Sequence, residues 1–456
     1  MYPYRKLRFL AFFLFICLHA PAQEFSFAAF KNDPSYGQNV QSTIKKRYEE
    51  DVSFLSGNNK KYIADIYEER YELIKKRFTS NEILTAAEPQ QYLSALADEI
   101  LKNNPEYNSK GLNILFSKSF YANATSMGEG SIFFNIGLFH RLQNESQAAF
   151  VLCHELAHYY LNHNNNNIHQ YVTTIYSDNF QQKLKSIQKL SYEKNKQLDA
   201  LAKNLLFRNR RHGRAFEHAA DSMALELMKN TNYDIREALT CLSILDSADK
   251  DKYSQEVVLE QHFNFASFPF KKSWIENDDL VFAKTEDKES HDLDSLKTHP
   301  DCAKRIEVLK EKVRQYEKKG SKKFIVSESK FNALIKQFDY EVIEYCVQSG
   351  RISRALYYAL EMIQIYPGDP YLNTIIGKCL NELYTTQKNH TLSKIVDLPN
   401  PEHDIEYNSL LHMIQNLRLR EIAALSFYFL KEREPQFYSF APFAEVYNQS
   451  KQHFNQ

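Results

Sequence analysis

The spacing of apolar residues along the chain predicts a mainly helical protein that contains one short β-rich stretch. From about residue 40 to residue 110 the chain is rich in charge and helical in pattern, as in the run "IYEERYELIKKRF". The next segment, "LNILFSKSFYANATSMGEGSIFFNIGLF", places aromatic and β-branched residues around a Gly-containing turn, which is typical of strands. Gly and Pro number only 11 and 13 in 456 residues, which also favours helices.

A buried helix is predicted directly after this stretch, in the run "FVLCHELAHYYLNH" from Phe150 to His163. Apolar and small side chains surround its polar group, and the run contains no Pro or Gly. His154 and His158 are four residues apart, so they lie on one face of the helix. Burial of two imidazoles and a carboxylate is unfavourable unless these groups are paired or bind a metal.

The middle of the chain is predicted to be helical with two polar interruptions. The run "NHNNNNIH" predicts an exposed loop, with metal or ligand contact as the alternative. A Lys/Gln-rich helix is expected to end near Arg211, and a second, apolar helix to run from about Arg214 to Met228. The charged, irregular residues from 246 to 296 predict a long loop over the surface or the cleft.

Repeated helices are predicted from about Phe331 to the C-terminus. The runs "EYCVQSGRISRALYYALEMIQIYPGDP" and "HMIQNLRLREIAALSFYFLKEREP" share a helix, a short break, a second helix and a terminal Pro. Pro367 and Pro435 are 68 residues apart, twice the 34-residue period of tetratricopeptide (TPR) repeats. We therefore expect TPR-like helical repeats over residues 331–456, with an all-α domain of another kind as the alternative.

The N-terminus has the three parts of a secretory signal peptide. Three cations precede an apolar run from Phe9 to Leu18, and the residues "APA" at 20–22 offer a cleavage site. We expect residues 1–22 to be removed, with an uncleaved anchor as the alternative. No later stretch approaches ~18 uninterrupted apolar residues, so no membrane span is expected after cleavage. The protein is then exported: periplasmic and able to associate with a membrane if bacterial, and secreted otherwise.

Charge and cysteine content exclude two classes of partner and scaffold. The 57 basic residues balance 57 acidic ones, so we expect no nucleic-acid partner. The five cysteines that remain after cleavage are scattered and odd in number, which argues against a disulfide scaffold and against a cysteine zinc site. Cys346 and Cys379 could pair in an oxidising compartment, but two buried free thiols are the simpler expectation.

The strongest chemical motif is His154-Glu155-Leu156-Ala157-His158, which fits the H-E-x-x-H pattern. In this pattern both histidines bind one zinc ion and the glutamate acts as general base. One helical turn, about 5.4 Å, lets the two imidazoles converge on one ion. Because five residues can match by chance, the context has to decide, and a zinc hydrolase needs a third protein ligand and an open fourth position.

The third ligand does not come from the residues that follow the motif. In the metzincin extension a glycine and a third histidine are required where this chain has Leu161 and Asn164. His163 comes one residue too early, so we expect it at the surface or behind a ligand. Glu217 and Asp221, four residues apart in the apolar run "RAFEHAADSMALELM", are the better candidates.

Glu217 can ligate the metal, while Asp221 can accept the far ring N–H of a zinc-binding histidine and fix its tautomer. The alternative is a carboxylate pair without metal, satisfied by Arg214 or His218.

Four blocks of the sequence, in this order, resemble the HtpX-like gluzincin metallopeptidases, which include the CAAX prenyl proteases. The blocks are "NATSMGEGSIFFNIGL", "HELAH", "RAFEHAAD" and "THPDCAKRI", and the resemblance covers about Leu112 to Leu309. The third matches the family's Arg-x-x-Glu-x-x-Ala-Asp block and the fourth its His-Pro-x-x-x-x-Arg-Ile block. Together they are far more specific than the first motif alone.

The resemblance implies one zinc ion per chain and assigns its ligands and base, which are His154, His158, Glu217 and Glu155. Asp221 and Arg214 belong to the same block as Glu217 and are expected beside the ligands. His299 matches a histidine near the zinc that is implicated in catalysis or in gating of access. On its own, the pair His299-Pro300 would predict only a turn or a helix start.

The expected architecture is mainly α (α+β): a zincin-like metallopeptidase domain with a small β-sheet over residues 23–325, then the all-α, TPR-like domain. This layout resembles the periplasmic beta-barrel assembly-enhancing protease type. It implies a protease that removes misassembled clients and a tail that contacts a protein partner, the outer-membrane assembly machinery. We expect a zinc-dependent metalloendopeptidase that cleaves proteins or peptides in the cell envelope, in protein quality control.

Further expectations and alternatives complete the hypothesis. The strand at Ser131 to Phe134 is expected to be an edge strand that pairs with an extended substrate. A chain truncated near Lys330 is expected to keep zinc and to cleave a small peptide while losing its protein partner. The alternative is a tail that packs over the cleft as a lid or supports the peptidase domain, in which case truncation raises cleavage sharply or unfolds that domain. A non-catalytic chaperone or scaffold with structural zinc is one alternative, although it has no need of Glu155 as a base. A zinc hydrolase of non-protein amides or cell-wall peptides is the other.

Overall fold

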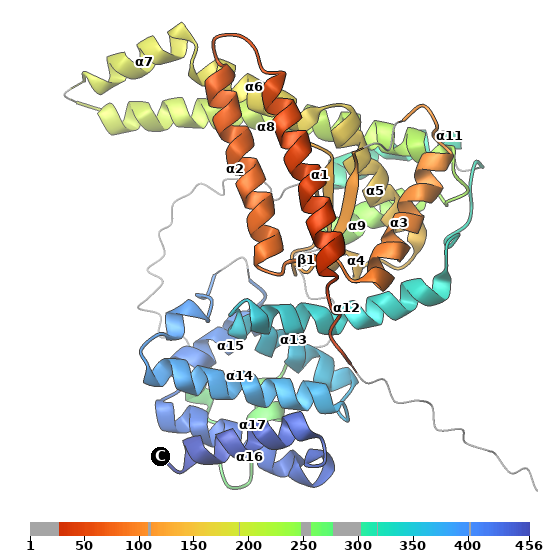
Figure 1. Cartoon of the computed structure of the whole chain (residues 1–456). Helices are drawn as coiled ribbons and strands as arrows, with labels where there is room; N and C mark the ends of the chain where they lie inside the picture. The colour runs from red at the N-terminus through yellow and green to blue at the C-terminus, as the bar shows by residue number, and fades with distance from the viewer. Residues whose placement is uncertain are drawn as a thin grey trace, which may run out of the picture.

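The computed structural model describes residues 27–107, 111–190, 192–247, 257–276, 302–316, 318–400 and 403–456. A helical body with a small sheet forms the upper part of Figure 1, and an all-helical tail lies below it. The mainly α (α+β) architecture is therefore confirmed. The predicted signal peptide and His299 lie outside the described residues. Within the described residues, no helix is both long and apolar enough to span a bilayer.

The body is built from a four-stranded sheet and the helices that surround it. The strands are β1 (Ile83–Leu84), β2 (Asn113–Ser117), β3 (Ala124–Ser126) and β4 (Ser131–Asn135). The helices before α8 are α1 (Pro34–Ser53), α2 (Lys60–Thr79), α3 (Ala87–Lys102), α4 (Ile136–Phe139), α5 (Glu145–Tyr160), α6 (His163–Ile175) and α7 (Asp178–Gln188). The later elements are α8 (Lys194–Lys229), α9 (Glu237–Asp246), α10 (Leu259–Phe263), the 3-10 turn η1 (Lys272–Trp274) and α11 (Cys302–Tyr316).

The sheet order is β1-β2-β4-β3, in which β2 and β4 are parallel and the outer pairs are antiparallel. The expectation that Ser131 to Phe134 forms an edge strand is wrong, because this segment is the central strand β4. Strand β4 pairs with β2 on one side and with β3 on the other, and all five of its residues are buried. The edge beside α5 belongs to the short strand β3 instead.

Two helix boundaries also differ from the sequence prediction. The break expected near Arg211 does not exist, since α8 is one helix of 36 residues that continues through Gly213. A Cβ atom added at Gly213 would have no neighbouring atom within 4 Å, so this position faces open space. The residues on both sides of Gly213 in the sequence are good helix formers. The asparagine run expected as a loop forms the first turns of α6.

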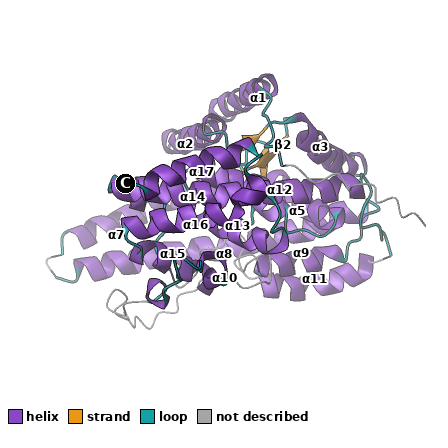
Figure 2. Cartoon of the chain, turned by 90° about the horizontal axis from the view of Figure 1, so that it is seen from below, coloured by secondary structure: helices purple, strands orange, loops and turns teal. Residues whose placement is uncertain are grey.

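The tail consists of α12 (Glu328–Gln348), α13 (Ile352–Ile365), α14 (Pro370–Lys388), the 3-10 turn η3 (Leu392–Lys394), α15 (Ile405–Asn416), α16 (Leu419–Phe437) and α17 (Ala441–Phe454). Figure 2 shows α14, α16 and α17 side by side. Pro367 follows α13 as expected, but Pro435 lies inside α16 rather than after it, where buried Phe437 holds the last turn in the core. The TPR-like repeat stays a prediction.

The tail shares a core with the body. The ring of Phe338 in α12 lies 4.9 Å from that of Phe116 and 5.6 Å from that of Phe139, centroid to centroid. Buried Glu145, the first residue of α5, accepts hydrogen bonds of 2.6–2.8 Å from the backbone N–H groups of residues 325–327. All five described cysteines are buried free thiols, Cys346 and Cys379 included. The two parts are joined by packing as well as by the chain.

The segment of residues 257–276 strengthens this junction from the other side. It contacts the tail through α10 and η1. Trp274 is 2% exposed, and both its indole N–H and the Lys271 ammonium bond Glu421 of α16, at 3.3 and 2.6 Å. Truncation near Lys330 would expose both this segment and the rings under Phe338, so we now expect it to destabilise the body.

A single substitution tests the shared core. Phe338→Ala should lower the free energy of unfolding by about 3–5 kcal/mol, because the ring is fully buried against aromatic neighbours. Thermal unfolding followed by circular dichroism measures the effect, with Leu398→Ala as the control because Leu398 is 74% exposed. Equal melting temperatures for the two variants would show that α12 does not stabilise the body.

Candidate metal centre

Helix α5 carries the motif through the core. It begins after Asn144, whose side-chain oxygen caps the helix by accepting the backbone N–H of Gln147 at 3.1 Å. Every residue of α5 from Glu145 to Ala157 is buried, and α5 packs along α8. The two polar residues at the start of the motif are 4% and 2% exposed. Such burial of charge-bearing groups needs partners: α8 supplies those of His154, and strand β3 supplies one for Glu155.

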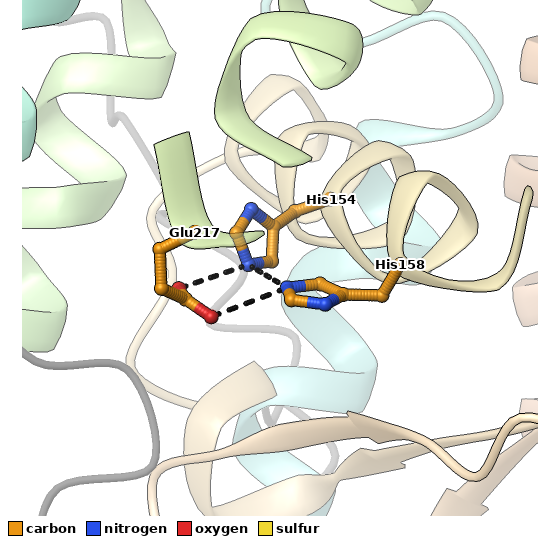
Figure 3. A group of neighbouring side chains, drawn as sticks. All are labelled: His154, His158 and Glu217. Carbon is orange, nitrogen blue, oxygen red and sulfur yellow. Dashed lines mark hydrogen bonds and ion pairs between the residues drawn. The ribbon is translucent and has the colours of Figure 1, made fainter. Parts of the chain in front are cut away.

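Three side chains from α5 and α8 converge on one point, as Figure 3 shows. The Nε2 atoms of His154 and His158 are 3.0 Å apart. The Glu217 carboxylate faces both rings, with distances of 3.4 Å to His154 Nε2 and 3.3 Å to His158 Nε2. The sequence-predicted ligand set is thus brought together, although its role as a ligand set is a proposal.

The spacing of these atoms fits a tetrahedral zinc ion. Zinc–ligand distances near 2.0–2.1 Å place adjacent tetrahedral ligands about 3.3 Å apart. The three observed separations lie between 3.0 and 3.4 Å. Two imidazoles and one carboxylate are also a donor set that zinc hydrolases use, and three protein ligands leave a fourth position for water or substrate. The residues present therefore fit the ion.

Asp221 lies behind His154, as the sequence predicted. Its Oδ1 is 3.0 Å from His154 Nδ1, the ring nitrogen that faces away from the cluster. Asp221 is fully buried and also accepts two hydrogen bonds of 2.7 Å from Arg305 of α11. Burial by itself would raise the pKa of Asp221, but Arg305 and His154 outweigh it and lower that pKa. The charged carboxylate fixes the tautomer in which His154 presents Nε2 to a metal.

Arg305 is the site residue that sequence reasoning missed. Its Nη1 is 3.2 Å from the Glu217 carboxylate, so it contacts both acidic residues. Burial opposes its charge, but Asp221 and Glu217 outweigh this effect and raise its pKa. The signal was present in the block "THPDCAKRI", where an arginine stands in an otherwise buried helix face. Arg214 is half-buried on α8 three residues before Glu217, and its role stays a prediction.

Glu155 is held by the edge strand. Its Oε2 accepts the backbone N–H of Ser126 at 2.7 Å, and both groups are buried. The carbonyl of Ser126 accepts the side-chain N–H of Asn164, from the first turn of α6, at 2.8 Å. The base expected from the motif therefore has a fixed position between α5 and β3. Neither Ser126 nor Asn164 was assigned this role from the sequence.

Zinc uptake should be coupled to proton release. Burial tends to lower the pKa of His154, but Asp221 and Glu217 outweigh it and raise that pKa to about 9, so the metal-free ring is protonated at neutral pH. Only the neutral ring binds metal. Zinc affinity should therefore fall as the pH drops below about 9, because the proton competes with the ion.

In the metal-free protein the proton on His154 stabilises the fold, because the folded state binds it more tightly than the unfolded state does. Its stabilisation of the fold is complete below pH 6.5 and is lost as the pH rises through about 9.

Calorimetric zinc titrations in buffers of different ionisation enthalpy measure the protons released when zinc binds. A binding enthalpy that is independent of the buffer at neutral pH would contradict the coupling.

His163 supports the second histidine. It is buried, its Nδ1 is 3.1 Å from His158 Nδ1, and its ring stacks on Phe216 at 4.3 Å. Burial lowers the pKa of His163 to about 4, so the ring is neutral and can accept the N–H of His158. His163 is thus behind a ligand rather than at the surface, one of the two places that the sequence left open.

His163→Ala should weaken zinc binding by about 10–100-fold, because His158 loses the acceptor that orients it. His163→Asn is the matched control, since it removes the same ring but keeps an oxygen near the place of Nδ1. Competition with a coloured zinc chelator gives both affinities. Two equal affinities would assign the effect to lost stacking on Phe216 rather than to the hydrogen bond.

The part of the chain that contains these residues matches a known family. Residues 86–313, half of the 456-residue chain, match the model of Peptidase family M48. No curated protein matches the chain. The matched range includes β2, β3, β4, α5 and α8 complete, and thus every side chain of the cluster. The gluzincin-type resemblance is confirmed: the chain belongs to peptidase family M48, whose members are zinc-dependent metallopeptidases.

Proposed function

We propose that the chain is a zinc-dependent metalloendopeptidase that cleaves proteins or peptides in the cell envelope and acts in protein quality control. The observation that carries the catalytic part is the convergence of His154, His158 and Glu217 at tetrahedral spacing. The cell-envelope part rests on the signal-like sequence of residues 1–22, and the quality-control part on the resemblance in layout.

Each residue has a defined task in this proposal. His154, His158 and Glu217 hold the ion, which when bound supplies Lewis-acid chemistry to a carbonyl group and to water. Glu155 takes a proton from the attacking water onto its carboxylate and later gives it to the leaving amine nitrogen. Ser126 keeps the Glu155 carboxylate in place through its backbone N–H. Asp221, itself held by Arg305, orients His154.

The substrate backbone is proposed to pair with β3 rather than with β4. Strand β3 lies at the edge of the sheet and packs against α5. An extended segment that adds to this edge would replace the 2.8 Å contact between Asn164 and the Ser126 carbonyl. Only an unfolded segment can present its backbone in this way, which favours damaged or misassembled proteins as substrates.

The tail is proposed to bind a protein partner through TPR-like helices, as in the periplasmic beta-barrel assembly-enhancing protease type. Its support is the stack of α12 to α17 and the spacing of the two sequence runs. Because the tail shares a core with the body, partner binding would act on a rigidly connected peptidase. A chaperone with structural zinc remains the rival, and buried Glu155 counts against it.

Substrate class is tested with the metal-depleted full chain, before and after addition of one equivalent of zinc. The proposal expects fragments from unfolded casein only in the zinc-loaded sample, and little cleavage of a folded protein such as native lysozyme. A cell-wall peptide and a simple non-peptide amide are the parallel substrates. If only these parallel substrates are cleaved, the chain is a zinc hydrolase of cell-wall peptides or non-protein amides. If no substrate is cleaved, the result favours a non-catalytic scaffold with structural zinc.

A further inference from the structure

A pair of antiparallel helical segments projects from the body. Helix α7, the turn after it and the start of α8 (residues 178–190 and 192–196) form this projection, which we name the tip hairpin. Figure 1 shows it at the upper left, extended away from the sheet and from the tail. Helix α7 packs on α8, and along α7 Ile187 is 3% exposed while Phe180 and Leu184 are half-buried. The apolar side of α7 is therefore turned toward α8, and the opposite side of the hairpin faces solvent.

The outer surface of the tip hairpin is basic. Five lysines stand between residues 183 and 196 against one acidic residue, Glu193, in a chain whose total formal charge is zero. All five are exposed; they are Lys183, Lys185, Lys189, Lys194 and Lys196. Glu193 neutralises only one of them, since it lies 3.5 Å from Lys196 in a fully solvated pair. Asp178, at the start of α7, is the second acidic residue of the hairpin, so the hairpin carries a net formal charge of +3.

Two apolar side chains stand in the middle of these charges. Tyr192 is 87% exposed and Leu190 is 38% exposed, both in the turn between α7 and α8. Solvated lysines around an exposed aromatic ring and an exposed leucine are the composition of a peripheral membrane contact: the rings enter the interfacial layer and the ammonium groups contact lipid phosphates. Lysine is depleted from protein–protein interfaces, so a surface with five lysines favours a lipid partner over an acidic protein.

We propose that the tip hairpin docks on the surface of a lipid bilayer that contains anionic headgroups. The contact is peripheral, through Leu190, Tyr192 and the five lysines, and it needs no membrane span. The inference concerns a different part of the molecule from the metal cluster, so it stands or fails independently of the proposed peptidase activity.

The docking position has a consequence for the cluster, because α8 connects the two. The helix runs without a break from Lys194 at the tip to Glu217, which at 1.5 Å per residue is about 35 Å. A hairpin bound to lipid would hold the metal centre at this fixed reach from the contact. Unfolded segments that emerge from the bilayer would then lie within range of β3.

Vesicle co-sedimentation of the full chain tests the proposal. Vesicles of phosphatidylcholine alone are compared with equimolar phosphatidylcholine and phosphatidylglycerol, at low and at high salt. We expect binding only to the anionic vesicles and release by high salt. No binding to either vesicle, or equal binding to both, overturns the proposal.

Two variants locate the contact. Lys183→Gln, Lys185→Gln and Lys189→Gln combined should weaken partition about 100-fold, since each lysine near an anionic surface contributes roughly a fivefold factor. The matched control changes three exposed lysines outside the hairpin, namely Lys310, Lys318 and Lys319, to Gln. Equal losses from the two triple variants would reduce the effect to total charge and overturn the proposal.

Tyr192→Ser should weaken partition a few fold, beside Tyr438→Ser, which removes an exposed tyrosine of the tail. Polyglutamate is added as a competitor. If it displaces the chain from vesicles while Tyr192→Ser binds as wild type does, the hairpin is a site for acidic protein and the membrane proposal is wrong. Casein cleavage in solution should be the same for all these variants, which separates this test from that of the peptidase.

Discussion

Glu155→Gln should nearly abolish hydrolysis while leaving zinc content and melting temperature close to those of wild type. The substitution keeps the size of the side chain. It also keeps an oxygen that can accept the hydrogen bond from the Ser126 N–H, which the Glu155 carboxylate accepts at 2.7 Å. It removes only the capacity to take a proton, and general-base catalysis of this kind contributes about 10²–10⁴-fold to the rate. We therefore expect kcat to fall within that range and KM to change little.

The comparison needs equal zinc occupancy in both proteins, since loss of metal would imitate loss of the base. Hydrolysis of an unfolded peptide is followed after reconstitution, with metal content measured on the same samples. Asp178→Asn, at the start of α7, changes one exposed carboxylate outside the site and serves as the control. Undiminished turnover by Glu155→Gln would remove this residue from the mechanism.

Glu217→Ala should lose zinc, which is the second large effect. The carboxylate spans the two histidines at 3.3 and 3.4 Å, so its removal leaves two ligands, too few for a zinc-hydrolase centre. It also takes one of the two acidic partners from Arg305, but Asp221 keeps its two 2.7 Å bonds to that guanidinium. The fold should therefore survive the substitution better than the site does.

Asp221→Asn is the informative companion variant, because it changes the residue behind the ligand. Loss of such an orienting group costs about 10–100-fold in metal affinity. The variant should also be less stable, since it leaves the buried Arg305 charge without its main partner. Competition with a chelator gives the zinc affinities of wild type, Asp221→Asn and Glu217→Ala, which we expect to fall in that order. Stoichiometric zinc in Glu217→Ala after dialysis against the chelator would mean that another residue completes the site.

The candidate site was largely predictable because its central motif is local. The four-residue spacing of His154 and His158 sets their geometry by one helical turn, whatever the rest of the fold does. Glu217 and Asp221 share one helix face for the same reason. Arg305 escaped prediction because it lies 84 residues from Asp221, and only the packing of α11 on α8 brings the two together.

The sheet and the helix ends show where sequence patterns fail. An apolar strand such as β4 carries no mark that tells a central strand from an edge strand, since the neighbour on each side is chosen by pairing far along the chain. Gly213 and Pro435 are helix breakers by propensity, yet both lie inside helices. The cost of one glycine in a helix, near 1 kcal/mol, is small against the long run of good helix formers on both sides of Gly213.

The tail shows the same limit at the level of domains. A change in composition near Phe331 indicates where the repeated helices begin, but composition does not report that Phe338 inserts between rings of the body. The peptidase part and the tail are therefore separate stretches of sequence that share one hydrophobic core.

We propose that this M48 chain binds one hydrolytic zinc ion at the cluster of α5 and α8. The most direct test measures zinc per chain and casein degradation on one preparation, as isolated, after chelation and after stepwise return of zinc. We expect one zinc per chain, loss of casein degradation when the metal is removed, and recovery in proportion to the zinc returned. Degradation that continues in the zinc-free chain, or a fully loaded chain that never degrades casein, would contradict the proposal.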